Sequence, residues 1–281
     1  MKRIVTIQDL TCLGKCALTV ALPVISAMGV EPSVIPTSVL SVHTEFPEFI
    51  ARDMPALIPQ VAESWKRQNV HFDGIYTGYI GSPEQMEQIS VFIDQFKRQD
   101  TLIFIDPVLG DTGSFYPGFD VAFSQAMAQL CAKADIIVPN LTEAALLLGR
   151  PCLEEGYSRE DIQTLLQDLT QLGVPKVILT GVGLEENRLG VMAYDSQSGQ
   201  YFSHFSKKHP LRFHGTGDVF ASTCFAALTR GASLEQALTL AVNFVSESIS
   251  ASLQDPNRRW YSVNFEQALG YLVEQAKTLP N

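Results

Sequence analysis

Residues 101–106 read Thr-Leu-Ile-Phe-Ile-Asp, a short apolar segment that ends in a carboxylate. Because polar and apolar side chains do not alternate in it, the segment is typical of a strand buried on both faces of a parallel sheet. Comparable strand patterns occur at residues 3–8, 33–40 (broken by Pro36), 74–80, 135–139 and 176–180.

Helical patterns separate these strands. Apolar residues recur at helical spacing in residues 16–28, 56–68, 83–98, 218–228, 233–250 and 265–277. Two further strands, residues 189–194 and 200–205, flank a polar turn and predict one antiparallel hairpin. The β-α-β-α order therefore predicts one α/β domain over residues 1–281, with three layers (α/β/α) and a mostly parallel central sheet.

The composition bears on location and partners. Twenty Lys and Arg stand against thirty Asp and Glu, a net charge of −10 at pH 7, and no basic run is available for a phosphate backbone. Residues 16–30 are too short for a membrane span, and Gln8, Asp9 and Lys15 interrupt any signal-like segment. Five irregularly spaced cysteines predict free thiols. We therefore expect a cytoplasmic protein without nucleic-acid or membrane partners.

Four carboxylates follow strands or begin helices in this pattern. In open α/β sheets, ligands bind outside the carboxyl ends of the strands, so these positions are expected to share one rim. The four are Asp9, Asp106, Glu143 and Asp218. Such a cluster suits acid/base chemistry with a divalent cation.

The segment Gly215-Thr216-Gly217-Asp218 is the most informative motif. A glycine-rich turn that leads into a helix presents free N–H groups to an anion. Asp218 beside it can accept the proton of a hydroxyl that attacks phosphorus, or it can simply cap the helix. Glu143 and Asp106 likewise have two interpretations: Mg²⁺ and phosphate chemistry, or helix-terminus and turn carboxylates.

The order of the motifs resembles that of vitamin B6 kinases, the pyridoxal kinase group of the ribokinase-like superfamily. The residues that carry the resemblance are Ile7-Gln8, Gly14, Ser41-Val42-His43-Thr44, Thr77-Gly78-Tyr79-Ile80-Gly81-Ser82, Asp106-Pro107-Val108-Leu109-Gly110, Pro139-Asn140-Leu141-Thr142-Glu143 and Gly215-Thr216-Gly217-Asp218. The last three segments mark the superfamily, and the His-Thr and Gly-Tyr-Ile-Gly segments point to the B6 branch.

The resemblance implies an ATP-dependent kinase for the 5′-hydroxymethyl group of pyridoxal, pyridoxamine or pyridoxine. It also implies a homodimer and a use of Mg²⁺, and it leaves a monovalent-cation requirement open. By position, Asp218 is the expected base and the backbone of Gly215, Thr216 and Gly217 the anion hole. The other implied contacts are Asp106 and Glu143 for Mg²⁺ and ATP phosphates, Asn140 and Thr180 near the nucleotide, and Asp9, Thr44 and Tyr79 around the pyridine ring.

The sequence departs from the family in ways that bear on the substrate. Asp9 stands where many relatives have Ser, and Lys15 and Ala17 replace a pair that is often His and Gly. A hydroxymethylpyrimidine kinase of thiamine synthesis is an alternative that shares the phosphoryl-transfer residues. A nonenzymatic protein that binds a B6 vitamer or a nucleotide is the alternative from a different class. Cys12, His43 and His214 remain further candidates near the rim.

Overall fold

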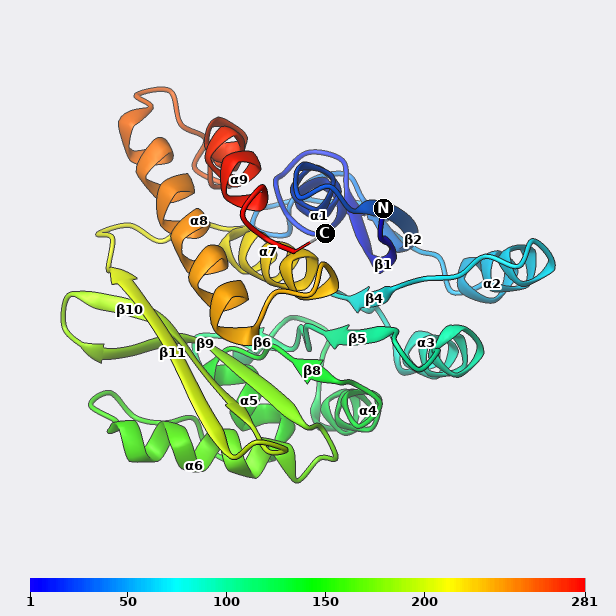
Figure 1. Cartoon of the computed structure of the whole chain (residues 1–281), viewed down its shortest axis with the longest axis horizontal. Helices are drawn as coiled ribbons and strands as arrows, with labels where there is room; N and C mark the ends of the chain where they lie inside the picture. Colours follow the sequence, from blue (N-terminus) through cyan, green and yellow to red (C-terminus); the bar gives the residue numbers. More distant parts are fainter. Residues whose placement is uncertain (281) are drawn as a thin grey trace.

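One nine-stranded sheet runs through the molecule in this computed structural model, which describes residues 1–280 (Figure 1). The strand order is β11-β10-β9-β8-β5-β4-β1-β2-β3. The strands are β1 (Arg3–Thr11), β2 (Glu31–Leu40), β3 (Ala51–Asp53), β4 (Gly74–Thr77), β5 (Leu102–Ile105), β8 (Ile136–Ile137), β9 (Lys176–Glu185), β10 (Arg188–Asp195) and β11 (Gln200–Lys207). The six from β9 to β2 in this order pair in parallel, which confirms the predicted sheet.

Helices cover both faces of the sheet and complete the three layers (Figure 1). One buried cluster joins the sheet to α1 (Leu18–Ala27), α7 (Thr216–Thr229), α8 (Leu234–Gln254) and α9 (Leu269–Ala276). A second cluster joins the other face to α2 (Leu57–Arg67), α3 (Pro83–Phe96), α4 (Val121–Cys131), α5 (Leu141–Leu147) and α6 (Arg159–Thr170). Both faces of the sheet are therefore buried, as the uninterrupted apolar strands predict.

The predicted hairpin is present, and antiparallel pairing extends beyond it. Strands β10 and β11 pair from Arg188↔Lys207 to Asp195↔Gln200. Strand β9 also pairs antiparallel with β10, β3 pairs antiparallel with β2, and a separate two-stranded sheet joins β6 (Gly110–Asp111) to β7 (Ser114–Phe115). The added strands β3, β6 and β7 are two or three residues long, too short to carry an alternation pattern.

Strand β2 continues through Pro36, where the sequence pattern suggested a break. Pro36 is paired with Gln8, and the register then shifts so that Leu10 pairs with Val39. A β-bulge accommodates a residue without a backbone N–H, and it turns a neighbouring side chain away from the regular pleat. Asp9 lies in this irregularity, so the bulge sets the position of a candidate site residue.

Other predicted elements also differ at their ends. Strand β4 stops at Thr77 instead of reaching residue 80, β8 is shorter than residues 135–139, and β9 continues past residue 180 to Glu185. The C-terminal pattern from residue 265 forms a 3₁₀ turn, η1 (Phe265–Ala268), before helix α9 begins.

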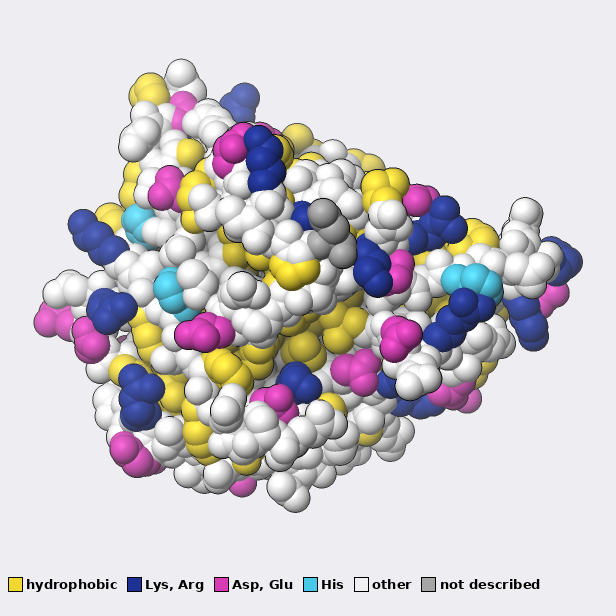
Figure 2. Space-filling view, in the orientation of Figure 1, with side chains coloured by type: hydrophobic (Ala, Val, Ile, Leu, Met, Phe, Trp, Pro, Cys, Tyr) yellow, Lys and Arg dark blue, Asp and Glu magenta, His cyan; other side chains and the backbone are white. Residues whose placement is uncertain are grey.

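The surface carries mixed charge. On the face shown in Figure 2, the described Lys and Arg side chains lie among Asp and Glu side chains rather than in one continuous area. Within residues 1–280, no helix combines the length and the apolar character needed to cross a membrane.

Candidate active site

The four predicted carboxylates meet at the carboxyl edge of the sheet. Asp9 lies near the end of β1, Asp106 directly follows β5, Glu143 lies in the first turn of α5, and Asp218 lies in the first turn of α7. Asp9 acts electrostatically on Asp218, and both Glu143 and Asp218 act on Asp106. The structure therefore brings together the residues that the strand-end rule predicts.

A glycine turn precedes α7 and shapes its N-terminus. Gly215 has φ 80° and stands at the N-cap without a side-chain hydrogen bond to the helix. A Cβ at this position would lie 2.1 Å from the Lys15 carbonyl oxygen, so only glycine fits. The N–H groups of Thr216 and Gly217 have no acceptor within the helix. Because a Cβ on Gly217 would meet nothing within 4 Å, this turn is open to an anion.

Asp218 is half-buried beside this turn and has an unusual proton affinity. Burial, followed by the charge of Asp9, raises the pKa of Asp218 to about 7, although a hydrogen bond from the Ala17 N–H opposes the rise. A carboxylate with a pKa near neutrality accepts a proton more readily than an ordinary aspartate. Asp218 is therefore suited to the task of a general base.

The pKa of Asp218 predicts an acid limb in the activity profile. Protonated Asp218 cannot accept a proton, so kcat/KM should fall as the pH falls through about 7, by about tenfold per pH unit at the lower end. Measurement of kcat/KM from pH 5 to pH 9 checks this, because kcat/KM reports the pKa values of the unliganded enzyme. A limb near pH 4, the range of an unperturbed aspartate, would contradict the assigned role.

Glu143 is tied to the backbone at the start of α5. Its two carboxylate oxygens accept hydrogen bonds from the Asn140 N–H at 2.8 Å and the Leu109 N–H at 3.2 Å. Asn140 completes a capping box by accepting from the Glu143 N–H at 2.9 Å and donating to the Gly110 carbonyl at 3.0 Å. These contacts fix the turn that follows β5 against α5. Thr180 joins the same region, since its N–H donates to the Pro139 carbonyl.

Burial raises the pKa of Glu143 to about 8. Burial, followed by the negative charges of Glu143 and Asp218, also raises the pKa of Asp106. A bound cation would relieve the repulsion between these carboxylates. Within residues 1–280, no three His, Cys, Asp or Glu side chains are grouped to hold a metal ion. The pair nevertheless fits Mg²⁺, which in kinase sites uses one or two carboxylates together with substrate phosphates and water.

Asp9 and Tyr79 form a second part of the site, since Asp9 acts electrostatically on both Asp218 and Tyr79. Asp9 is 6% exposed, accepts a hydrogen bond from the Thr11 hydroxyl at 2.7 Å, and has its pKa raised to about 6, mainly by burial. Burial and the charges of Asp53 and Asp9 raise the pKa of Tyr79 to about 12. The Tyr79 ring stacks on Phe119 with centroids 5.8 Å apart. A carboxylate and an aromatic ring therefore face the same part of the rim.

Thr44 differs from these two residues because it is exposed in the loop after β2, without a described contact to Asp9 or Tyr79. Its neighbour His43 links that loop to the anion turn. The His43 and His214 rings lie 5.0 Å apart, and burial together with His214 lowers the pKa of His43. The loop that carries Thr44 thus packs beside the glycine turn.

Two residues close to the carboxylates escaped prediction. Cys16 lies near Asp218 and Asp9, and burial and these two charges raise the pKa of its thiol. Tyr116 follows strand β7, and burial and the charges of Glu143, Asp111, Asp106 and Asp218 raise the pKa of its hydroxyl. Neither residue belongs to a recognisable motif, and only the close approach of loops from different strands brings them to the rim. Cys12, the thiol considered earlier, is exposed.

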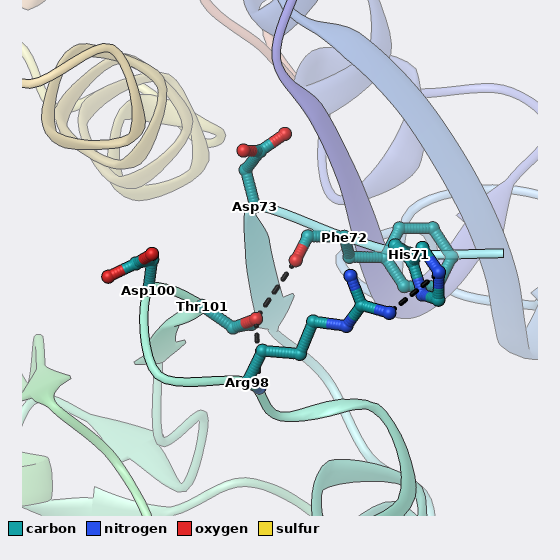
Figure 3. Close-up of a pocket in the computed structure, with 6 residues that line it drawn as sticks. All are labelled: His71, Phe72, Asp73, Arg98, Asp100 and Thr101. Carbon is teal, nitrogen blue, oxygen red and sulfur yellow. Dashed lines mark hydrogen bonds between the residues drawn. The ribbon is translucent and has the colours of Figure 1, made fainter.

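A pocket of about 180 Å³ lies at the opposite edge of the sheet (Figure 3). It is lined by residues that precede β4 and β5, including His71, Asp73, Arg98 and Thr101. The Arg98 guanidinium meets the His71 ring at 2.6 Å, and the Thr101 hydroxyl donates to the Phe72 carbonyl at 2.9 Å. This pocket is separate from the carboxylate rim because it lies at the amino ends of the strands.

Comparisons with known proteins match the whole fold. The family model for phosphomethylpyrimidine kinase matches residues 18–260. A hydroxymethylpyrimidine/phosphomethylpyrimidine kinase of Bacillus subtilis is 26% identical over 88% of this chain and 82% of its own. Pyridoxal kinase from Lactobacillus plantarum has a TM-score of 0.90 and 30% identity over 100% of both chains. A Bacteroides thetaiotaomicron protein, provisionally described as a phosphomethylpyrimidine kinase and solved with pyridoxal, has a TM-score of 0.91 and 37% identity over 96% of this chain and 95% of its own.

Proposed function

This chain belongs to the phosphomethylpyrimidine kinase family, with pyridoxal kinases among its relatives, and from that premise we propose that it phosphorylates a vitamin B6 vitamer. The substrates proposed are ATP and the 5′-hydroxymethyl group of pyridoxal, pyridoxamine or pyridoxine. The observation that carries the proposal is the position of Asp218, which directly follows the open glycine turn and lies within electrostatic reach of Asp9, itself near Tyr79.

The proposed mechanism is an in-line transfer of the γ-phosphoryl group. Asp218 accepts the proton of the attacking hydroxyl, and the N–H groups of the Gly215–Gly217 turn hold the transferred oxygens. The amides and the dipole of α7 oppose the negative charge that develops there. These parts come from one helix terminus, so their mutual distances are set by the fold before a substrate arrives.

Asp9, Tyr79 and Thr44 are proposed to hold the pyridine ring. The Asp9 carboxylate suits a protonated ring nitrogen or another donor of the ring, and Tyr79 offers an aromatic surface to a flat ligand. Thr44 would contribute from the exposed loop after β2, a different segment from those that carry Asp9 and Tyr79.

Asp106, Asn140, Glu143 and Thr180 are proposed to serve the nucleotide side. Asp106 and Glu143 would hold Mg²⁺, Glu143 directly or through water, since both of its oxygens already accept backbone hydrogen bonds. Bound Mg²⁺ would neutralise phosphate charge. Asn140 and Thr180 keep the α5 terminus and the middle of β9 in register around these carboxylates.

A hydroxymethylpyrimidine kinase is the second candidate, favoured by the matching family model and by the Bacillus subtilis relative. The two candidates share Asp218 and the glycine turn and differ only in the ring that they accept. An assay of ATP consumption with the three vitamers, hydroxymethylpyrimidine and ribose separates them. Turnover with a vitamer is expected, and activity confined to the pyrimidine would replace the proposed substrate. Vitamer binding without ATP consumption would favour a nonenzymatic role.

Asp9→Asn should change both substrate binding and the pH profile. Loss of the charge removes an ionic hydrogen bond worth about 1.5–3 kcal/mol, so KM for the vitamer should rise by about tenfold or more. Because the charge of Asp9 raises the pKa of Asp218, the acid limb of kcat/KM should also move to lower pH. An unchanged KM and an unmoved limb in pH-dependent kinetics would remove Asp9 from the ring site.

A further inference from the structure

Four buried hydroxyl groups, those of Tyr76, Thr77, Ser222 and Ser262, lack hydrogen-bond partners among the described residues, and those of Tyr76 and Ser222 lie together beneath the rim. Tyr76, in β4, and Ser222, in α7, are both 0% exposed. The Tyr76 hydroxyl oxygen and the Ser222 Oγ have no hydrogen-bond partner among the described residues. Buried polar groups are almost always paired with protein or ordered water, so two neighbouring exceptions beside a candidate active site need a physical explanation.

The packing of α7 over β4 places the two hydroxyls together. Phe225 of α7 lies against Gly74, since a Cβ on Gly74 would approach its ring to 2.7 Å. Tyr76 is two residues further along β4, and its ring contacts Phe225 with centroids 5.3 Å apart. Ser222 is nearly one turn closer than Phe225 to the start of α7. The Ser222 hydroxyl lies close enough to that of Tyr76 to lower its pKa, but the two do not meet the geometry of a hydrogen bond.

Ser222 also behaves differently from the other buried hydroxyl residues of these helices. Thr223 and Thr229 in α7 donate to the carbonyl four residues earlier, at 2.7 and 2.8 Å. Ser248 in α8 does the same at 2.7 Å. Ser222 has this local alternative, the Asp218 carbonyl, and does not use it. Its hydroxyl is therefore available to a partner other than the helix backbone.

Two acceptors lie within electrostatic reach of this pair. The pKa of Tyr76 is raised well above its ordinary value by burial first and then by the charges of Asp106 and Asp218. Asp218 is one helical turn before Ser222, and Asp106 follows β5, the strand next to β4. A water molecule can accept two hydrogen bonds and donate two, which matches two hydroxyl donors and two carboxylate acceptors.

We propose that one buried water molecule accepts hydrogen bonds from the Tyr76 and Ser222 hydroxyls and donates to Asp218 and Asp106. Tyr76 and Ser222 are then positioning residues: they hold the water that orients the Asp218 carboxylate toward the substrate hydroxyl. The inference rests on the proposed role of Asp218 as the base. It does not depend on which ring the site accepts.

A double-mutant cycle tests this arrangement. Tyr76→Phe and Ser222→Ala each remove one oxygen and keep the packing. Each should lower kcat by about tenfold, as for other residues that orient a reactive group through an intermediary, while KM for both substrates stays within twofold. Because both act through one water, the double variant should be no slower than the slower single variant. Thr229→Val removes a buried hydroxyl at the other end of α7, beside Gly74 at the start of β4, and should leave kcat unchanged.

Crystallography of the unaltered protein supplies an independent measurement. Electron density for a water within about 3 Å of both hydroxyl oxygens is expected. The proposal is overturned by a parent structure that shows ordered buried waters elsewhere but none here, or by kcat values within twofold of the parent in all three variants. The kinetic measurements use whichever phosphoryl acceptor the ATP-consumption assay identifies. The test therefore remains valid even if that acceptor is not a B6 vitamer. A normal rate for an Asp218 variant would remove the base assignment without removing the water.

Discussion

Asp218→Asn should lower kcat by about 10²–10⁴, the range usual for the loss of a general base. The amide has nearly the same shape and cannot take the proton of the attacking hydroxyl. Because the pKa of Asp218 is raised to about 7, the ionised carboxylate present at pH 8 destabilises the folded state. The neutral amide removes this cost, so the melting temperature of the variant at pH 8 should be no lower than that of the parent. Single-turnover kinetics and a thermal melt separate loss of chemistry from loss of fold.

A matched control addresses the other interpretation of Asp218, a charge at a helix N-terminus. Glu235 occupies the first turn of α8, which begins beyond the C-terminal end of α7 and so away from the rim, and it is exposed. Glu235→Gln removes the same favourable interaction with a helix dipole, worth about 0.3–1 kcal/mol, and should leave kcat unchanged. If Asp218→Asn and Glu235→Gln gave the same small effects, Asp218 would be a capping residue and the proposed mechanism would fail.

The parallel core of the fold could be predicted because burial on both faces leaves a direct mark on the sequence. Residues 102–105, all apolar, became β5, and the helix-period segments became helices on the two faces. Strand β3 could not be predicted, since its three residues are all exposed and pair only with β2. Strand β9 continues beyond Thr180, where the predicted strand ended, because it pairs antiparallel with β10 as far as Glu185. No local sequence pattern predicts that pairing.

The candidate site was predictable to the extent that it consists of strand ends and helix starts. The four carboxylates meet because parallel strands end at the same edge. The sequence could not tell a capping Glu143 from a metal-binding one, because both uses place an acidic residue three positions after Asn140. The structure shows the cap outright, with both halves of the box present, and the metal role stays a proposal. Tyr116 and Cys16 reach the rim only through packing between distant segments.

The clustering of acidic groups also has an energetic consequence. Asp9, Asp106, Glu143 and Asp218 all have pKa values above their ordinary range, chiefly because of burial. Buried like charges destabilise the ionised cluster, and a bound cation relieves that repulsion. The rim is therefore better adapted to binding Mg²⁺ with an anionic nucleotide than to binding the nucleotide alone.

Gly215→Ala should lower kcat/KM by about 10²–10³, comparable to the loss of a donor from an oxyanion hole. Gly215 has φ 80°, and the added Cβ would lie 2.1 Å from the Lys15 carbonyl oxygen, so the backbone of one loop must move. That loop also supplies the Ala17 N–H that bonds Asp218. The substitution therefore displaces the anion turn and the base together. As a result, kcat should fall and KM for ATP should rise.

Gly199→Ala separates the two causes of this effect. Gly199, in the β10/β11 turn, has φ 70°, so alanine there meets the same unfavourable backbone conformation, at a cost of about 1–3 kcal/mol, but its Cβ would touch nothing within 4 Å. Its melting temperature should fall while its kinetics match those of the parent. Gly215→Ala should lose stability and also lose activity. If the two variants lost equal stability and neither lost activity, the Lys15 contact would be incidental and the Gly215–Gly217 turn would not hold the transferred phosphoryl group.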